Sequence, residues 1–401
     1  MQIIPRHLEP ALREAARHFP VVTLTGPRQS GKTTLVRATF PNHAYVSLEL
    51  PDERAFARED PRGFLARFAG PVILDEIQRV PELLSYIQAA VDADTGARGR
   101  FILTGSHNLL LREKVSQSLA GRTAVLHLLP LSLTELWRHP PLDPERLGEP
   151  PQAGPPPHAD SPWPVLHAGF YPAIHDRQVP APLWLAAYRE TYLERDVRQL
   201  VQVGDLEAFD RFLRLAAGRN GQLLNLSSLA ADCGITQPTA RRWLGVLEAS
   251  YLVVRVPAYR SSRRKRLVKA PRLYFLDTGL LCHLLRIETP QALEQRAERG
   301  AVFEAFVVSE LHKAYLHAGR ASTLHHWRDI QGHEVDLILE TSRGPLAVEI
   351  KSGATVAADF FRGLRRWRQT LGEPSAPAAL VYGGTERYFR EQVAVHPWHD
   401  L

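Results

Sequence analysis

One stretch near the start of the sequence has the residue types and the spacing needed to bind phosphate groups. It reads Gly-Pro-Arg-Gln-Ser-Gly-Lys-Thr from residue 26 and matches the pattern G-x-x-x-x-G-K-[ST]. Its glycines allow backbone N–H groups to surround a phosphate, and a following helix N-terminus adds a favourable dipole. Lys32 would neutralise the β- and γ-phosphates, and the Thr33 hydroxyl would ligate Mg²⁺. The residues expected to bind the nucleotide, ATP, are Gly26, Arg28, Gln29, Ser30, Gly31, Lys32, Thr33 and Thr34.

Two acidic residues follow an apolar run and would complete such a phosphate site. Asp75 and Glu76 come directly after Val72–Leu74. Ligands of open parallel sheets bind at the carboxyl ends of the strands, which is where this run delivers Asp75. We therefore expect Asp75 to hold the Mg²⁺ ion and Glu76 to polarise the attacking water. The alternative is that both acids only cap a loop.

Thr104 and Arg122 are further catalytic candidates for the same site. Thr104 ends the apolar run Phe101–Thr104, so its hydroxyl could orient the water or sense the γ-phosphate; a strand-end cap is the alternative. Arg122 could act as an arginine finger, within the chain or across a subunit boundary, since a fixed guanidinium stabilises charge on the transferring phosphoryl group. With 43 arginines against six lysines in the chain, a coincidental arginine is the competing interpretation.

A second group of acids lies near the C-terminus. Residues 346–351 alternate between apolar and polar, so Glu349 and Lys351 share one strand face. Asp336 lies on the preceding predicted strand, and Glu304 lies in an apolar helix, where a carboxylate needs a partner or a metal. The set resembles the PD-(D/E)xK nuclease signature, in which Glu304, Asp336 and Glu349 would hold Mg²⁺ and Lys351 would position a water. A simple ion pair between Glu349 and Lys351 is the alternative.

Residues 226–256 predict a helix, a turn, a second helix and a strand. Gly234 lies in the turn, Thr236 is the expected N-cap of the second helix, and Arg241 and Arg242 are expected on its exposed face. Seven basic residues and no acid fall between Arg255 and Lys269. Such a basic hairpin suits contacts with the phosphates of a nucleic acid, with DNA favoured. A protein-binding adaptor or a solvated strand edge is the alternative.

These residues need a scaffold, and the apolar pattern predicts one in several parts. The first 135 residues alternate continuously apolar strands with amphipathic stretches, which indicates a parallel sheet buried on both faces by helices. Ten prolines between Pro140 and Pro164 predict a linker. The predicted strands of the first part are Val21–Thr25, Tyr45–Leu48, Val72–Leu74, Phe101–Thr104 and Ala124–Leu128.

The predicted fold class is α/β: a P-loop NTPase parallel sheet, a helical and winged-helix domain, and a C-terminal α/β domain. In the last part we expect a helix over about 301–317, strands over 323–327, 335–340, 346–351 and 378–382, and a basic helix over 360–371. The expected domains are an ATPase core at 1–135, a Pro-rich linker at 136–182, a helical and winged-helix domain at 183–290 and a C-terminal domain at 291–401, for which the resemblance to the nuclease signature implies a restriction-endonuclease-like fold.

Composition limits the function classes. The chain has 401 residues, of which 44% are apolar and 23% charged, a balance typical of a globular protein. No apolar run approaches the roughly 20 residues that span a bilayer, so we expect no membrane partner. The first residues have no secretory pattern and there are only two cysteines, so a cytoplasmic location is expected. The net charge of +6 is a mild indication of polyanionic partners.

The sequence resembles the AAA+ ATPases, specifically a prokaryotic group whose core opens with GPRQ-x-GKTTL. This chain has that motif at 26–35, ILDEIQ at 73–78, LTGS at 103–106 and LAGR at 119–122. Further matching stretches are GFYP at 169–172, YLERD at 192–196, YFLDTG at 274–279 and VEIKSG at 348–353. The resemblance implies an ATPase followed by a winged helix and a restriction-endonuclease-like domain of uncharacterised function.

Three hypotheses follow from the sequence. The first is an Mg²⁺-dependent, ATP-hydrolysing protein coupled to a DNA-binding winged helix and a nuclease-like domain, acting in DNA maintenance or defence and able to form a homo-oligomer. The second is a nucleotide-switched regulatory or scaffold protein whose nuclease-like domain is catalytically silent. The third is a DNA-binding transcription factor in which both phosphate-chemistry motifs would go unused.

Overall fold

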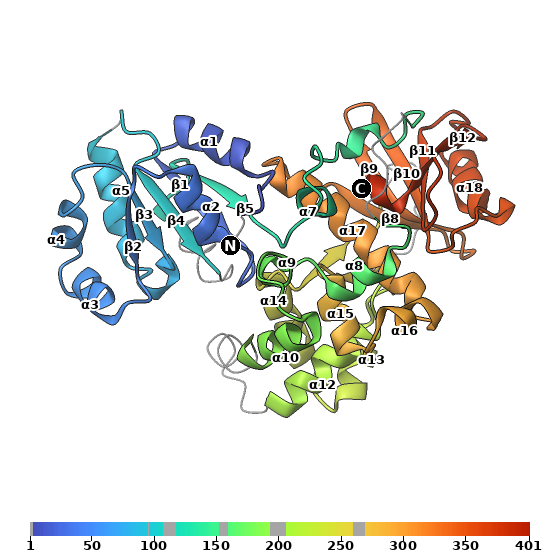
Figure 1. Ribbon diagram of the computed structural model, residues 1–401, viewed down its shortest axis with the longest axis horizontal. Helices are drawn as coiled ribbons and strands as arrows, with labels where there is room; N and C mark the ends of the chain where they lie inside the picture. Colours follow the sequence, from blue (N-terminus) through green and yellow to red (C-terminus); the bar gives the residue numbers. More distant parts are fainter. Residues whose placement is uncertain (1–2, 95, 107–117, 152–158, 193–205, 260–268) are drawn as a thin grey trace.

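The computed structural model describes residues 3–94, 96–106, 118–151, 159–192, 206–259 and 269–401. Figure 1 shows a sheet with its helices at each end of the molecule, formed by the N-terminal and the C-terminal parts of the chain. Helices from the middle of the chain lie between and below the two sheets. The basic segment expected at 260–266 lies outside the described residues, as does most of YLERD.

The N-terminal sheet is parallel, as predicted. Its strands are β1 (Val21–Thr25), β2 (Ala44–Ser47), β3 (Val72–Asp75), β4 (Phe101–Gly105) and β5 (Thr123–His127). They lie in the order β2-β3-β4-β1-β5, and each predicted strand is confirmed to within one residue at either end. Alternate residues of β1 enter two different apolar clusters, because both faces of the sheet are covered. All five carboxyl ends therefore meet at one edge.

Five helices surround this sheet and continue the expected alternation. They are α1 (Glu9–His18), α2 (Lys32–Thr39), α3 (Pro51–Glu59), α4 (Pro61–Ala66) and α5 (Leu83–Ala93). Asp60 caps α4 by accepting a hydrogen bond from the backbone N–H of Gly63. The helix that matters most for the site is α2, because it begins directly after the phosphate-binding motif.

The segment predicted as a linker contains ordered elements. They are a 3₁₀ turn η2 (Pro144–Arg146), α8 (Trp163–Ala168) and α9 (Pro172–Asp176), and α7 (Leu133–Leu136) comes just before them. Trp163, Leu166 and Phe170 are buried in the same core as the middle helices. The prediction of a linker up to residue 182 is therefore wrong from 163 onward, since the prolines obscured a short apolar pattern that packs into this core.

The middle part contains the predicted helix-turn-helix and a hairpin. Its elements are α10 (Ala181–Tyr192), α12 (Leu206–Ala217), α13 (Leu226–Cys233), α14 (Gln237–Ala249), β6 (Val253–Val256), β7 (Arg272–Phe275), α15 (Thr278–Leu284) and α16 (Pro290–Gln295). Gly234 ends α13 with φ +71°, and the predicted cap Thr236 accepts a hydrogen bond from the Thr239 N–H. Strands β6 and β7 pair antiparallel.

The C-terminal part is a six-stranded mixed sheet between two helices. Its elements are α17 (Arg299–His317), β8 (Leu324–Arg328), β9 (Glu334–Thr341), β10 (Gly344–Lys351), a 3₁₀ turn η4 (Ala358–Phe361), α18 (Arg362–Leu371), β11 (Ala378–Tyr382), β12 (Tyr388–Arg390), β13 (Val393–Pro397) and a 3₁₀ turn η5 (Trp398–Asp400). The strand order is β12-β13-β11-β10-β9-β8. Apolar residues of α17 pack on one face of this sheet and those of α18 on the other. No helix in the described part of the chain is both long and apolar enough to cross a membrane.

Candidate nucleotide site and a second acidic cluster

The phosphate-binding loop connects β1 to α2 at the carboxyl edge of the N-terminal sheet. Gly26 has φ +152°, and a Cβ there would lie 2.0 Å from the carbonyl oxygen of Leu128, so only glycine fits this position. Gly31 has φ +91° directly before α2. The two glycines of the motif thus form the turn that the sequence pattern predicted, and the loop leads into the helix N-terminus.

Lys32 lies folded onto its own loop. Its Nζ donates hydrogen bonds to the carbonyl oxygens of Gly26 at 3.0 Å and Pro27 at 2.7 Å, and the residue is 6% exposed. The ammonium group is therefore held at the loop that would receive the phosphates. Thr34 follows on the exposed side of α2.

Asp75 lies at the end of β3 and accepts hydrogen bonds from three hydroxyl groups. The Thr33 Oγ1 donates to both carboxylate oxygens at 3.1 and 3.0 Å, and the Tyr45 hydroxyl donates at 2.8 Å. Thr104, at the end of β4, donates to the same carboxylate. Burial and the Asp75 charge raise the pKa of Tyr45 to about 12, so this phenol remains a donor. The structure thus brings together Thr33, Asp75 and Thr104, which the sequence predicts at this edge of the sheet. Nothing in the sequence pattern indicated that Tyr45 would join them.

Glu76 follows in a left-handed backbone conformation with φ +59°. Its N–H donates to the Thr104 hydroxyl at 3.3 Å. Gln78 donates to the Glu76 carboxylate and also lies 3.2 Å from the Ser106 hydroxyl, so it fixes the direction of the acid. The strained backbone and these partners turn Glu76 out of the strand beside Asp75. Gln78 belongs to the ILDEIQ motif, yet its role could be read only from the structure.

Arg122 lies at the other edge of the sheet. It precedes β5, and its carbonyl accepts a hydrogen bond from Val21 N–H at the start of β1. Its guanidinium pairs with Asp92, with Nε and Nη2 at 2.6 and 2.9 Å from the two carboxylate oxygens. A five-residue strand, roughly 16 Å long, separates this edge from the phosphate-binding loop. The structure therefore does not bring Arg122 to the nucleotide site of its own chain.

Arg6, which sequence reasoning missed, holds the loop from outside. One guanidinium nitrogen donates to the Ser30 carbonyl at 2.7 Å and the other to the Leu129 carbonyl at 2.7 Å. Its Nε lies 3.1 Å from Glu135, which is fully buried. Burial opposes the charge of Glu135, but Arg6 and His317 together hold its pKa well below the usual range. An arginine outside the motif thus fixes the loop backbone.

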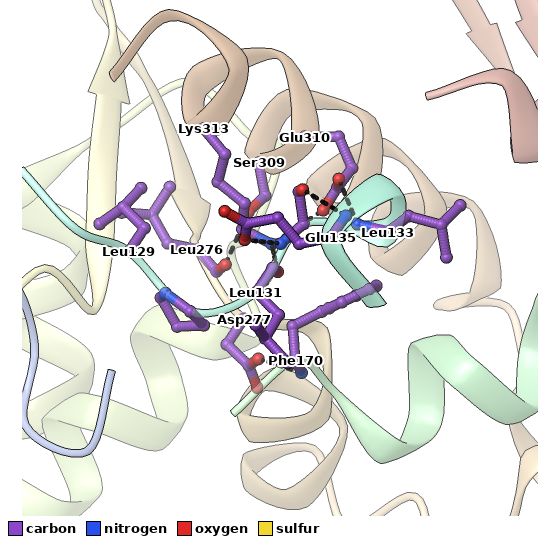
Figure 2. Close-up of polar contacts among 12 residues, drawn as sticks. Leu129, Leu131, Leu133, Glu135, Phe170, Leu276, Asp277, Ser309, Glu310 and Lys313 are labelled. Carbon is purple, nitrogen blue, oxygen red and sulfur yellow. Dashed lines mark hydrogen bonds and ion pairs between the residues drawn. The ribbon is translucent and has the colours of Figure 1, made fainter. Parts of the chain in front are cut away.

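The segment Leu129–Glu135 is bound to α17 through buried polar contacts, as Figure 2 shows. Lys313 donates to the Leu131 carbonyl and to Glu310, both at 2.8 Å, while Glu310 accepts from the Leu133 N–H at 2.8 Å. Lys313 is fully buried, so water cannot replace Glu310 and the Leu131 carbonyl as partners of its ammonium group. The nucleotide part and the C-terminal part are consequently joined through one helix.

A small recess lies beside the start of α2. It has a volume of about 80 Å³ and its lining includes Ile4, Thr34, Leu35 and Pro172. Asp176 also borders it, with a side chain 10% exposed; its Oδ1 has no hydrogen-bond partner and lies 3.9 Å from Arg177 Nε. Arg6 and Glu9 also line it, so the recess combines apolar and charged side chains.

Four carboxylates converge where α17 meets the C-terminal sheet, and we call them the acidic cluster: Glu304 of α17, Glu334 and Asp336 of β9, and Glu349 of β10. Their main partner is Arg272 of β7. One guanidinium nitrogen lies 3.1 Å from Glu304 and 3.6 Å from Asp336, and the other lies 2.6 Å from Glu334. Sequence reasoning missed Arg272, because it precedes an apolar Leu-Tyr-Phe run on another part of the chain.

Lys351 supplies a second cation. Its Nζ lies 2.6 Å from Glu349 and 3.8 Å from Asp336. Burial works against the charged form of Lys351, but Asp336 and Glu349 outweigh it and raise the pKa. Burial and the charge of Asp336 raise the pKa of Glu304 to about 7 and that of Glu349 to about 8. The cluster thus resists carrying its full negative charge.

The arrangement differs from the metal-ligand set expected from the sequence. The predicted residues Glu304, Asp336, Glu349 and Lys351 do come together, but Glu304 and Asp336 face the Arg272 guanidinium and Glu349 pairs with Lys351. No three His, Cys, Asp or Glu side chains in the described parts of the chain are grouped so that they could hold a metal ion. The physical reason is that Arg272 contacts both Glu304 and Asp336. Two positive side chains, Arg272 and Lys351, already neutralise the acids. A metal does not fit the cluster in this arrangement.

Comparison with known proteins agrees with the nucleotide site. Residues 18–137 match a family described as an AAA domain. Residues 163–291 and 299–401 match two domains of unknown function, DUF8612 and DUF4143. The loop geometry, the parallel sheet and the AAA match together define an AAA-type P-loop ATPase.

Relatives extend over almost the whole chain. It is 32% identical over 391 residues to the uncharacterized protein Rv2008c of Mycobacterium tuberculosis and equally to Mb2031c of Mycobacterium bovis, covering 97% of this chain and 82% of each relative. The chain belongs to the family of these mycobacterial proteins. Among solved structures, the Walker-type ATPase PABY2304 of Pyrococcus abyssi is 17% identical with a TM-score of 0.44, covering 71% of this chain and 96% of that one.

Proposed function

We propose that the protein is an Mg²⁺-dependent ATPase whose nucleotide state acts on a DNA-binding winged helix. The observation that carries the hydrolytic part is the carboxylate of Asp75, held by hydroxyls of Thr33, Thr104 and Tyr45 at the carboxyl edge of the sheet. Hydroxyl and carboxylate oxygens are the ligands that Mg²⁺ prefers. Thr33 and Asp75, already within hydrogen-bond distance of each other, fit the ion and would hold it.

Each residue of the site would have its own role in ATP hydrolysis. Lys32 leaves the carbonyls of Gly26 and Pro27 to neutralise the phosphates, while the loop N–H groups and the α2 N-terminus bind them. Glu76 orients the attacking water and accepts its proton, with Gln78 and Thr104 holding the acid and its backbone in place. The bound metal would supply neutralisation of charge on the phosphoryl group.

The recess beside α2 would receive the base. Leu35 and Pro172 of its lining suit one face of a purine, and Asp176 Oδ1, which has no hydrogen-bond partner, would accept from an amine of the base.

The DNA-binding part of the proposal is supported by α14. Arg241 and Arg242 are exposed on this second helix of the helix-turn-helix, and the hairpin β6–β7 follows it. The basic residues between the two strands would add phosphate contacts.

For the C-terminal domain, the contacts of Arg272 in the acidic cluster favour the second hypothesis, a catalytically silent nuclease-like fold. We therefore propose no cleavage reaction.

Two comparisons of variants test these assignments. Lys32→Ala should lose ATP binding, whereas Glu76→Gln should bind ATP and hydrolyse it at a rate lowered on the order of 100-fold. Equal phosphate release from wild type and both variants would remove the catalytic assignment.

For DNA, Arg241→Ala/Arg242→Ala should weaken duplex binding and reduce its salt dependence by about two charges. Arg17→Ala/Arg62→Ala, which removes two exposed arginines from the ATPase part, is the matched control.

A further inference from the structure

Arg272 is positioned as a cation of the C-terminal domain although it belongs to the hairpin of the middle part. It is 5% exposed and contacts carboxylates from α17 and β9. A guanidinium stays charged under all ordinary conditions and offers five donors in a planar fork, so it can hold several carboxylates at once. Tyr274, two residues further on the same strand, donates its hydroxyl to Glu304 at 2.5 Å. Both polar side chains of β7 thus point into the acidic cluster.

Of the remaining oxygens of the cluster, some are engaged by the backbone, whereas Glu349 Oε2 is buried without a hydrogen-bond partner. Asp336 Oδ2 accepts a hydrogen bond from the Ile350 N–H at 2.8 Å. A Cβ at Gly363, in the first turn of α18, would lie 2.4 Å from the Glu334 carbonyl and 3.1 Å from Glu349 Oε2. A Cβ at Gly221 would lie 3.2 Å from Glu304 Oε2. Glycine backbone therefore packs closely against the cluster on two sides.

We propose that Arg272 is the resident cation of the acidic cluster, and that the cluster is a latch fastening the β6–β7 hairpin to the C-terminal domain instead of a metal-dependent nuclease centre. The latch does not depend on the proposed ATPase activity, whereas its consequence for DNA binding rests on the proposed function. The latch fixes the strand that leads out of the basic hairpin, so the position of the DNA-binding module is determined by charges in the C-terminal domain. Removing either partner would leave buried charges unpaired.

The first experiment uses the nucleotide-free, full-length wild type, with Asp336→Asn as the comparison variant once circular dichroism shows that it is folded. Binding of Mn²⁺ is followed by electron paramagnetic resonance, and labelled DNA and RNA are incubated with Mn²⁺ or Mg²⁺. The expected result is no Mn²⁺ site tighter than about 1 mM and no cleavage. A Mn²⁺ site in the wild type that Asp336→Asn abolishes, or cleavage lost in that variant, would overturn the proposal. A failure of ATP hydrolysis in the same preparation would affect only the proposed function.

The second experiment measures the latch itself by a double-mutant cycle between Arg272→Gln and Glu304→Gln. Each single variant should lower the unfolding midpoint by about 5 °C or more, and the double variant should lose less than the sum of the two. Arg328→Gln is the matched control, because Arg328 lies 3.5 Å from Glu334 at the exposed rim of the cluster and should leave the midpoint within about 1 °C. Additive losses, or an Arg272→Gln variant as stable as the control, would exclude a latch.

Discussion

The two acid sites of this molecule place carboxylates in similar positions but give them different partners. At the nucleotide site, Asp75 ends a central strand and accepts hydrogen bonds from the hydroxyls of Thr33, Tyr45 and Thr104. At the acidic cluster, Asp336 lies on a strand beside Arg272 and Lys351. A sequence pattern of acids after or within apolar strands describes both sites equally well.

The difference between the partners decides what each site can bind. A hydroxyl carries a lone pair, so it can turn from donating to a carboxylate to ligating a metal beside it. A guanidinium has no lone pair available and cannot lose its proton, so it excludes a metal unless it is withdrawn. We therefore infer that Asp75 is arranged to admit a divalent ion, whereas Asp336 is arranged to hold a positive side chain.

The largest expected effect comes from neutralising the two aspartates in turn. Asp75→Asn should lower Mg²⁺-dependent ATP hydrolysis on the order of 100-fold, because the metal loses a charged ligand. Asp336→Asn should leave hydrolysis within about twofold of wild type, since it lies in the other sheet. Steady-state phosphate release at saturating Mg²⁺ measures both. A comparable fall in both variants would show that the sites are catalytically linked and would break the comparison.

Arg6 is a buried arginine like Arg272, but it contacts the phosphate-binding loop. Its substitution therefore tests the nucleotide site. Arg6→Gln leaves Glu135 without its nearest cation, which should cost about 3–5 kcal/mol in free energy of unfolding. It also releases the Ser30 carbonyl, so the KM for ATP should rise while kcat changes less. Chemical unfolding and the kinetic constants measure the two effects.

Arg13→Gln is the control for Arg6, because Arg13 pairs with Glu9 at the exposed surface of α1. It should change unfolding by no more than about 1 kcal/mol. If Arg6→Gln lowered stability without moving KM, its bond to Ser30 would have no role in positioning the loop.

These contrasts show how far sequence reasoning reaches. The motif at 26–33 and the apolar runs predicted the nucleotide loop, the strands and the neighbours Asp75 and Thr104, because short-range spacing and strand ends determine them. Arg6, Tyr45 and Arg272 were missed, since each acts across long stretches of chain on a partner that no local pattern indicates. The Pro-rich segment was assigned as linker up to residue 182, although Trp163 and Phe170 are buried, because two short helices give too little periodicity.

Two tyrosines offer a finer test of the same contrast, since each donates a hydrogen bond to an acid of one site. Tyr45→Phe removes a donor that orients Asp75, so the Mg²⁺ concentration for half-maximal hydrolysis should rise about tenfold. Tyr274→Phe removes the donor to Glu304 and should leave that concentration unchanged while lowering the unfolding midpoint. A Mg²⁺ titration and a thermal melt of both variants separate the outcomes. An unchanged titration for Tyr45→Phe would mean that Asp75 is held well enough by Thr33 and Thr104.

The smallest effect is expected at Arg122. Its guanidinium pairs with Asp92 at the sheet edge opposite the nucleotide loop, so within one chain it cannot reach the phosphates. Arg122→Ala and Asp92→Ala should therefore give the same ATPase activity as wild type at low protein concentration. The charge pair is exposed, which is why the two variants should also melt close to wild type. A specific activity that rises steeply with protein concentration in wild type and in Asp92→Ala, but not in Arg122→Ala, would instead assign Arg122 to the nucleotide of a neighbouring subunit.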